Sequence, residues 1–137
     1  MPETRPVTDA ARLICTCDAT MRLAPETLGA AGRPATQLCR AELGAFRAAL
    51  GRHAAITVAC TQEAPLFAEV AEEEGYSGTL RFANIRETAG WSEDGARAAP
   101  KMAALLAMAE IEAAQFETVT LESRGVALLL GRDETVI

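Results

Sequence analysis

The sequence has a single histidine, His53, and no cluster of basic residues. Its 13 Lys and Arg are outnumbered by 19 Asp and Glu, which leaves a net charge of −6 over 137 residues. One histidine supplies little material for a histidine-based metal site or a catalytic triad. An acidic chain without a basic patch argues against a nucleic acid or an anionic membrane as its partner.

Long apolar runs are also missing. No stretch approaches the length of a transmembrane helix, and the start of the chain, MPETRPVTDAAR, lacks the apolar core of a secretory signal peptide. We therefore expect a cytoplasmic protein without membrane insertion, in which residues 1–10 form a flexible leader. In a reducing compartment, four cysteines are more often metal ligands or reactive thiols than disulfides.

The rest of the chain alternates between strand and helix patterns. Strand patterns cover residues 11–15, 36–39, 54–61 and 79–85, and helix patterns cover residues 25–28, 41–52, 65–75 and 100–114. Such alternation predicts an α/β domain over residues 11–117, with three layers and a mostly parallel sheet, Rossmann-like or flavodoxin-like. Residues 118–137 are predicted to hold one or two further strands and the start of a following unit of a longer protein.

The four cysteines fall at the ends of the predicted strands. Cys15, Cys39 and Cys60 each end one strand, and Cys17 lies one step beyond Cys15 in a C-x-C pair. The carboxyl ends of parallel strands meet at one edge of a sheet, where ligands bind in α/β folds. The sequence therefore predicts that all four thiols converge on a single site.

Four converging thiolates suit a [4Fe-4S] cluster or a Cys₄ zinc ion. Structural zinc sites usually draw on C-x₂-C pairs in small domains, and this chain has no such pair and enough residues for an apolar core. The helices predicted after Cys39 and Cys60 would point their N-termini at the site and stabilise a negatively charged cluster. Arg40 is a candidate to add positive charge, although a solvated surface arginine is the simpler interpretation. We therefore expect an electron-transfer module with one [4Fe-4S] cluster.

Three alternatives remain open. A Cys₄ zinc ion would make the protein a structural or binding module without redox chemistry. A low-pKa thiolate or strained disulfide in the C-x-C pair would make it a thiol-based redox protein, but would leave Cys39 and Cys60 unexplained. The four cysteines could also be unrelated buried residues, because free cysteine is among the most buried residue types.

Several segments together resemble a known family. They are LICTCDATM (13–21), QLCRAEL (37–43), ITVACTQEAPLFAEVAEEEGY (56–76), RFANIRETAGWS (81–92) and PKMAALLAMAEIEAA (100–114). This pattern is similar to the N-terminal domain of the iron–sulfur flavoprotein subunit of heterodisulfide reductase and its bacterial 4Fe-4S ferredoxin-type relatives. The resemblance implies an additional [4Fe-4S] cluster on the four cysteines. It also implies flavin- or ferredoxin-type redox domains or subunits as partners.

The resemblance also singles out Asn84, Arg86, Glu87 and Trp91. From the residues themselves, the segment ANIR should end at the edge of the sheet that holds the cysteines, so that Arg86 faces the cluster or a docked partner. An equally good interpretation pairs Arg86 with Glu87 to hold the following loop. Trp91 is interpreted as a packing anchor for that loop rather than as an electron relay.

The chain departs from the family pattern at three points. Asp18 stands where the family commonly has glycine, and ACTQEAP (59–65) replaces the usual residues around the fourth cysteine. The sequence also lacks a flavin-binding glycine fingerprint and a run of closely spaced cluster cysteines. Flavin chemistry and disulfide reduction are therefore not assigned to this chain.

Overall fold

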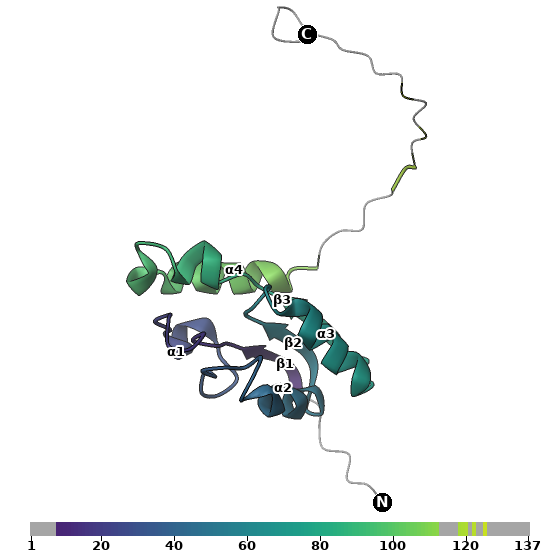
Figure 1. Ribbon diagram of the computed structural model, residues 1–137, viewed down its shortest axis with the longest axis horizontal. Helices are drawn as coiled ribbons and strands as arrows, with labels where there is room; N and C mark the ends of the chain where they lie inside the picture. Colours follow the sequence, from purple (N-terminus) through teal and green to yellow (C-terminus); the bar gives the residue numbers. More distant parts are fainter. Residues whose placement is uncertain (1–7, 113–117, 121, 123–124, 126–137) are drawn as a thin grey trace, which may run out of the picture.

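A parallel sheet lies at the centre of the structure, a computed structural model that describes residues 8–112, 118–120, 122 and 125. Its strands are β1 (Thr8–Leu13), β2 (His53–Val58) and β3 (Thr79–Phe82), hydrogen-bonded in that order (Figure 1). Leu13 pairs with Val58, and Val58 pairs with Phe82. The carboxyl ends of the three strands are therefore level with one another, and the predicted α/β fold with a parallel sheet is confirmed.

Helices cover both faces of this sheet. They are α1 (Pro25–Leu28), α2 (Leu43–Leu50), α3 (Ala64–Glu73) and α4 (Ala99–Glu110), with a π-helical turn η1 (Arg86–Gly90) and a 3₁₀ turn η2 (Gly95–Arg97). Proline occupies the first turn of α1, α3 and α4, where its missing N–H leaves no hydrogen bond unmade. The helices α2 and α3 pack on one face, and α1 and α4 on the other, which gives three layers (Figure 1).

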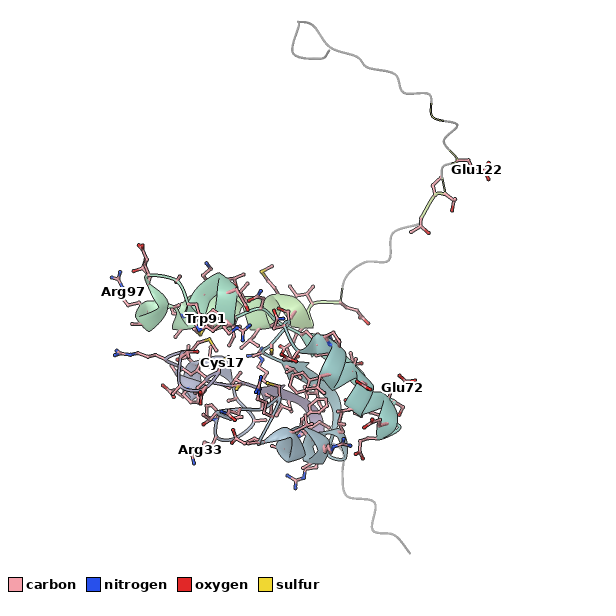
Figure 2. The ribbon with its side chains drawn as sticks, in the orientation of Figure 1. Cys17, Arg33, Glu72, Trp91, Arg97 and Glu122 are labelled. Atoms are coloured by element: carbon pink, nitrogen blue, oxygen red, sulfur yellow. The ribbon has the colours of Figure 1, made fainter. Side chains whose placement is uncertain are left out.

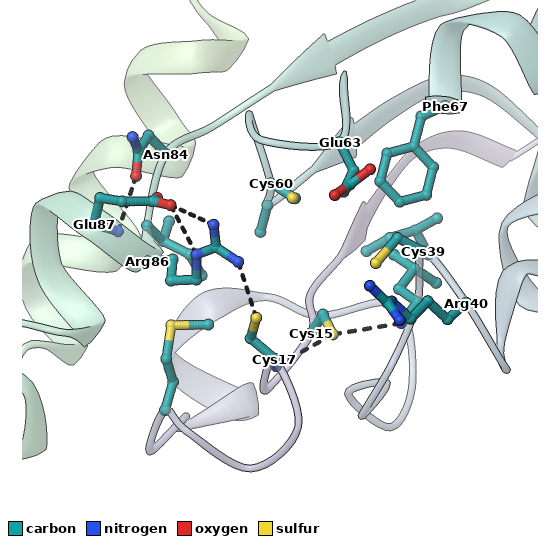
Figure 3. Close-up of a pocket in the computed structure, with 15 residues that line it drawn as sticks. Cys15, Cys17, Cys39, Arg40, Cys60, Glu63, Phe67, Asn84, Arg86 and Glu87 are labelled. Carbon is teal, nitrogen blue, oxygen red and sulfur yellow. Dashed lines mark hydrogen bonds and ion pairs between the residues drawn. The ribbon is translucent and has the colours of Figure 1, made fainter. Parts of the chain in front are cut away.

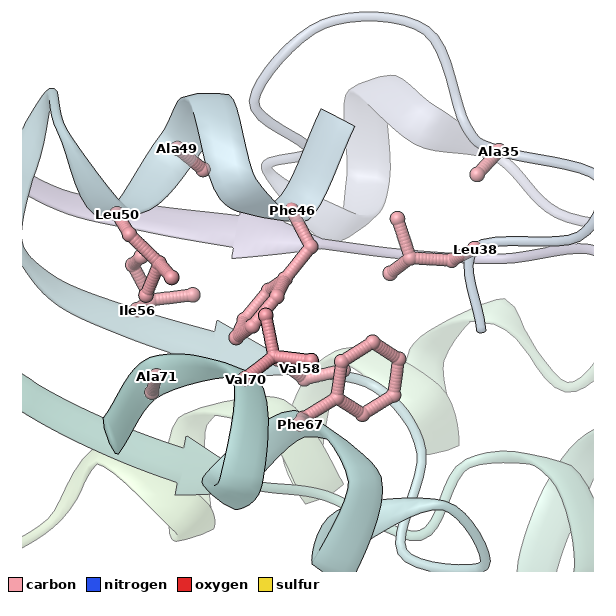
Figure 4. Packing of buried hydrophobic residues seen from close by; sticks show 10 residues of the cluster. All are labelled: Ala35, Leu38, Phe46, Ala49, Leu50, Ile56, Val58, Phe67, Val70 and Ala71. Carbon is pink, nitrogen blue, oxygen red and sulfur yellow. The ribbon is translucent and has the colours of Figure 1, made fainter. Parts of the chain in front are cut away.

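The central strand β2 is buried on both faces. Ile56 and Val58 pack with Phe46 of α2 and Phe67 of α3, and the two phenyl rings meet edge to face with centroids 4.8 Å apart (Figure 4). Thr57, which lies between Ile56 and Val58 in the sequence, is buried and points to the opposite face of the sheet. A strand covered on both sides in this way is typical of a parallel sheet.

A second apolar cluster lies beneath α4. Met102 and Leu106 of α4 are fully buried against Leu28 of α1, together with Ile14 and Ile85, which follow β1 and β3. The two clusters lie on opposite faces of the sheet. Helices therefore pack on both sides of the residues that follow the strands and hold this edge of the sheet in place.

The strand predicted at 36–39 is wrong. Ala35 forms an isolated parallel bridge with the chain that follows β1, but the backbone then turns. The N–H groups of Thr36 and Gln37 donate to the carboxylate of Glu42 instead of to a neighbouring strand. Because this carboxylate takes the donors that a strand would use, the segment pairs with the sheet over a single residue.

Other boundaries shift by a few residues. The strand β1 begins at Thr8, inside the predicted leader, because Thr8 pairs with His53 of β2. The last helix ends at Glu110 rather than at 114. Of the strands predicted in 118–131, the described residues 118–120, 122 and 125 form none, and the other predicted positions lie outside the described residues. In the described part of the chain, no helix combines the length and apolar character needed to cross a bilayer.

Arg12 ties three elements together beside the second cluster. Its Nε donates to Glu110 Oε1 at 2.7 Å, and its Nη1 donates to the carbonyl oxygen of Leu28 at 3.0 Å. The hydrogen bond from Arg12 is the largest cause of a lowered pKa at Glu110, opposed by burial and assisted by the Arg12 charge. This contact therefore joins β1 to α1 and α4.

Replacing Glu110 tests this contact. We expect Glu110→Gln to lower the free energy of unfolding by about 1 kcal/mol at neutral pH, because it removes a partly buried charged hydrogen bond. The pKa of Glu110 is lowered in the folded state, so the difference should be complete above about pH 4.3 and vanish as the pH falls through that lowered value. Urea unfolding at several pH values measures this, with Glu72→Gln on the exposed face of α3 as the control (Figure 2). Equal losses in the two variants would contradict the prediction.

Candidate functional site

All four cysteines line one pocket of about 170 Å³ at the carboxyl edge of the sheet (Figure 3). Three separate parts of the chain deliver them: Cys15 and Cys17 follow β1, Cys39 lies in the turn before α2, and Cys60 lies between β2 and α3. The other lining residues are Leu13, Met21, Leu38, Arg40, Ala59, Glu63, Phe67, Asn84, Ile85, Arg86 and Glu87. The expectation that the four cysteines share one place in the fold therefore agrees with the structure.

Cys39 reaches the pocket by a route that differs from the predicted one. The expectation that it ends a strand is wrong, because it lies in a turn. The bridge between Cys15 and Ala35 holds the preceding segment beside the end of β1. The N–H of Leu38 then donates to Cys15 Sγ at 3.5 Å, so the turn that carries Cys39 stays next to Cys15.

The sulfur atom of Cys15 lies among backbone polar groups. It accepts the N–H of Cys17 at 3.3 Å, and its S–H donates to the carbonyl oxygen of Thr36 at 3.1 Å. Backbone N–H donors of this kind stabilise a thiolate or a sulfur bound to a metal. Two donors, from Cys17 and Leu38, thus converge on one thiol.

Cys60 lies at the beginning of α3. Burial raises the pKa of its thiol, and this effect is opposed by hydrogen bonds from the backbone N–H groups of Glu63 and Gln62 and by the positive charge of Arg86. Glu63 is the N-cap residue of the ten-residue helix α3, and Gln62 directly precedes it. The N-terminus of α3 therefore lies beside Cys60.

The pKa of the Cys39 thiol depends on the other acidic groups in the pocket. Burial is the largest cause of its raised pKa, followed by the charges of Glu63, Cys60 and Cys15. Ionising several of these thiols together is therefore costly unless a positive charge compensates. A metal centre offsets this repulsion, because cysteine binds metals as the thiolate.

Cys17 has a cationic partner. Arg86 Nη1 donates to Cys17 Sγ at 3.0 Å, and Arg86 Nε donates to Glu87 Oε1 at 2.8 Å. The guanidinium carbon lies 4.4 Å from the centroid of the Trp91 ring, whose Nε1 donates to Thr20 Oγ1 at 2.9 Å. Arg86 therefore pairs with Glu87, as one interpretation of the sequence predicts, and also contacts Cys17.

Trp91 directly follows η1 and is half exposed, at 51%. Its Nε1 donates to Thr20 in the C-x-C loop, and its ring face lies against the guanidinium of Arg86. Asn84 acts within the same segment, where its Oδ1 accepts the N–H of Glu87 at 3.1 Å. Arg40 lines the pocket from an exposed position.

Sequence reasoning did not single out several residues of the pocket wall, among them Met21, Phe67 and Glu63. Met21 and Phe67 supply apolar surface, and Glu63 places a carboxylate between Cys39 and Cys60 (Figure 3). Glu63 comes three residues after Cys60, immediately before α3, and this spacing was the available signal. Met21 and Phe67 carry no such signal, because an apolar side chain near a turn is ordinarily part of a core.

The loop of the C-x-C pair has an unusual backbone. Cys17, Asp18 and Ala19 have φ values of +51°, +59° and +61°, so three successive residues with side chains adopt the left-handed conformation. This conformation costs about 1 kcal/mol or more for each such residue. Glycine adopts positive φ most easily, and none of these three positions is a glycine. The strained backbone therefore begins at Cys17 itself.

The four thiols line one pocket but do not lie close enough together to bind a single atom. Among the described residues, no group of three or more His, Cys, Asp or Glu side chains lies close enough together to hold a metal ion. A zinc ion would require every sulfur within about 2.3 Å of one centre. A cubane cluster is larger and holds its four cysteines at separate corners, so it tolerates thiols that are further apart.

The left-handed loop can be tested by glycine substitution. We expect Ala19→Gly to raise the free energy of unfolding by about 1 kcal/mol, because glycine adopts the positive φ of this exposed residue without strain. The same substitution at the exposed helical residue Ala104 should lower it by about 1 kcal/mol. Chemical unfolding of both variants measures the difference. A loss of stability at both positions would show that the loop is not left-handed.

Comparisons with protein-family models, with curated proteins and with solved structures found no match for this chain. The resemblance to the flavoprotein subunit of heterodisulfide reductase thus depends on the residues quoted for it. The functional assignment has to depend on the pocket itself.

Proposed function

We propose that the protein binds one [4Fe-4S] cluster through Cys15, Cys17, Cys39 and Cys60 and transfers single electrons. The observation that carries this proposal is the convergence of four thiols from three parts of the chain on one largely apolar pocket. Buried cysteines unrelated to one another would be spread over both apolar clusters. Here every cysteine of the sequence lines the same cavity.

The donor set fits the charge of such a cluster. An oxidised cubane with four thiolates is negatively charged, and its potential depends on hydrogen bonds to the sulfurs and on burial. Backbone N–H groups serve Cys15 and Cys60, and the Arg86 guanidinium serves Cys17. When bound, the cluster supplies one-electron redox chemistry, while the protein holds it, limits its contact with water and balances its charge.

The geometry favours the cluster over a Cys₄ zinc site and over a thiol-based redox site. A single zinc ion requires its sulfurs within bonding distance of one atom, and no three of the described His, Cys, Asp or Glu side chains lie that close together. A thiol redox protein that used Cys15 and Cys17 alone would have no role for Cys39, Cys60 and the helix N-terminus beside Cys60. Anaerobic purification distinguishes all three.

The electron partner is proposed to be another redox centre in the cytoplasm, of flavin or ferredoxin type. It would belong either to a further domain of the same polypeptide or to a separate subunit. The proposal follows from the chemistry of the site, because a [4Fe-4S] cluster held by four cysteines exchanges single electrons with a neighbouring redox centre. The family resemblance points in the same direction.

Anaerobic purification tests the proposed cluster. We expect a brown protein with about four iron atoms and four sulfide ions per chain, and without stoichiometric zinc. Colourless protein with about one zinc ion per chain would overturn the cluster in favour of a Cys₄ zinc site. Metal-free protein with one rapidly alkylated thiol would overturn it in favour of thiol chemistry.

Single substitutions identify the ligands. We expect serine at each of the four cysteine positions to reduce the iron content of the purified protein severely, because each removes one thiolate from the set. Thr61→Ala, at the exposed position beside Cys60, should retain the full iron content and serves as the control. Iron analysis and the visible absorption spectrum of each variant provide the measurement. A cysteine variant that matches Thr61→Ala would remove that cysteine from the ligand set.

A further inference from the structure

Arg86 enters the cysteine pocket from η1, and its side chain is only 18% exposed. Its Nη1 lies 3.0 Å from Cys17 Sγ, and its positive charge also opposes the rise in pKa that burial causes at Cys60. Figure 3 shows the guanidinium between these two cysteines, which come from different parts of the chain. One cation therefore acts on two of the four proposed ligands.

The guanidinium is held in place from three directions. Glu87 accepts hydrogen bonds from its Nε and Nη2, and Cys17 accepts one from its Nη1. The Trp91 ring lies against its face, with the ring centroid 4.4 Å from the guanidinium carbon. The pKa of Arg86 is raised, first by the hydrogen bond with Glu87 and then by the one with Cys17, so the side chain stays cationic. A fixed charge in a fixed orientation adds the same field to the site in every molecule.

The segment that carries Arg86 is in turn fastened to the C-x-C loop. Trp91 donates to Thr20, and Gly90 lies so close to Met21 that an added Cβ would stand 2.4 Å from its Sδ. These contacts join the Arg86 segment to the chain that follows Cys17. The position of the Arg86 charge relative to the Cys17 sulfur is therefore set by packing and not by the ion pair alone.

Reduction makes a cluster more negative. A hydrogen bond or a cation next to a ligand sulfur stabilises the reduced state more than the oxidised state, and therefore raises the reduction potential. The carboxylate of Glu87 next to the guanidinium has the opposite effect, because it cancels part of the positive field. Arg40 also lines the pocket but is exposed, so water weakens its field.

From this geometry we infer that Arg86 sets the reduction potential of the cluster at its Cys17 corner and that Glu87 limits the size of this effect. The inference rests on the proposed [4Fe-4S] function and extends it to the control of its potential. Arg86 acts through the Cys17 sulfur and is a positioning residue, with Trp91 as its support. The pair thus determines which electron donors can reduce the protein.

The experiment compares the reduction potentials of wild-type protein, Arg86→Gln, Arg86→Lys, Glu87→Gln and Arg40→Gln. All five proteins are purified anaerobically, their iron and sulfide are measured, and each is titrated with its electron paramagnetic resonance signal as the readout. Arg40→Gln is the matched control, since it removes the same charge from the same pocket without removing a sulfur hydrogen bond from the described structure.

We expect opposite shifts from the two partners. Arg86→Gln should move the potential to a more negative value, because it removes the cation from Cys17. Arg86→Lys should give a smaller negative shift, since an ammonium keeps the charge but lacks the planar fork. Glu87→Gln should move the potential to a more positive value, and Arg40→Gln should leave it close to that of the wild type.

The outcomes separate this inference from the proposed function. Wild-type protein without iron and sulfide overturns the cluster itself. Loaded protein in which Arg86→Gln shifts the potential no more than Arg40→Gln overturns the role of Arg86 alone. If Arg86→Gln fails to assemble a cluster, Glu87→Gln decides: a positive shift supports the inference, and an unchanged or more negative potential overturns it.

Discussion

The rest of the structure depends on the register of three parallel strands. Because Leu13, Val58 and Phe82 are level with one another, the chain leaves all three strands at the same edge of the sheet. The loops that follow carry three of the four cysteines and Arg86. A shift of one residue in any pair would turn side chains to the opposite face and scatter the site. The two apolar clusters, one on each face, hold that register.

Electrostatics at this edge are arranged around sulfur. Burial is the largest cause of the raised pKa values of Cys39 and Cys60, and nearby negative charges add to it, which is unfavourable for isolated thiolates. Backbone N–H groups at the start of α3 and the guanidinium of Arg86 oppose this effect. The left-handed backbone from Cys17 to Ala19 adds local strain at the same place. Strained backbone persists only where its surroundings impose it. Here Arg86 holds the loop at Cys17, and Trp91 holds it at Thr20.

The placement of the cysteines was predictable to different degrees. Cys15 and Cys60 follow apolar strands that are evident from their β-branched and aliphatic runs, so their positions follow from the general geometry of parallel sheets. Cys39 was placed at the correct edge for the wrong reason. Its segment turns because Glu42 binds the backbone N–H groups of Thr36 and Gln37, an interaction that no strand or helix period reveals.

The fold class, the alternation of strands and helices and the edge at which the cysteines gather can be derived from the sequence alone, because periodicity and β-branched runs act locally. The contact of Arg86 with Cys17, 69 residues away in the chain, and the place of Glu63 among the thiols depend on the tertiary structure. So does the position of α4, which crosses the second face of the sheet and whose last residue, Glu110, binds Arg12. These contacts join residues that are distant in sequence, and they form only when strand pairing and helix packing bring those residues together.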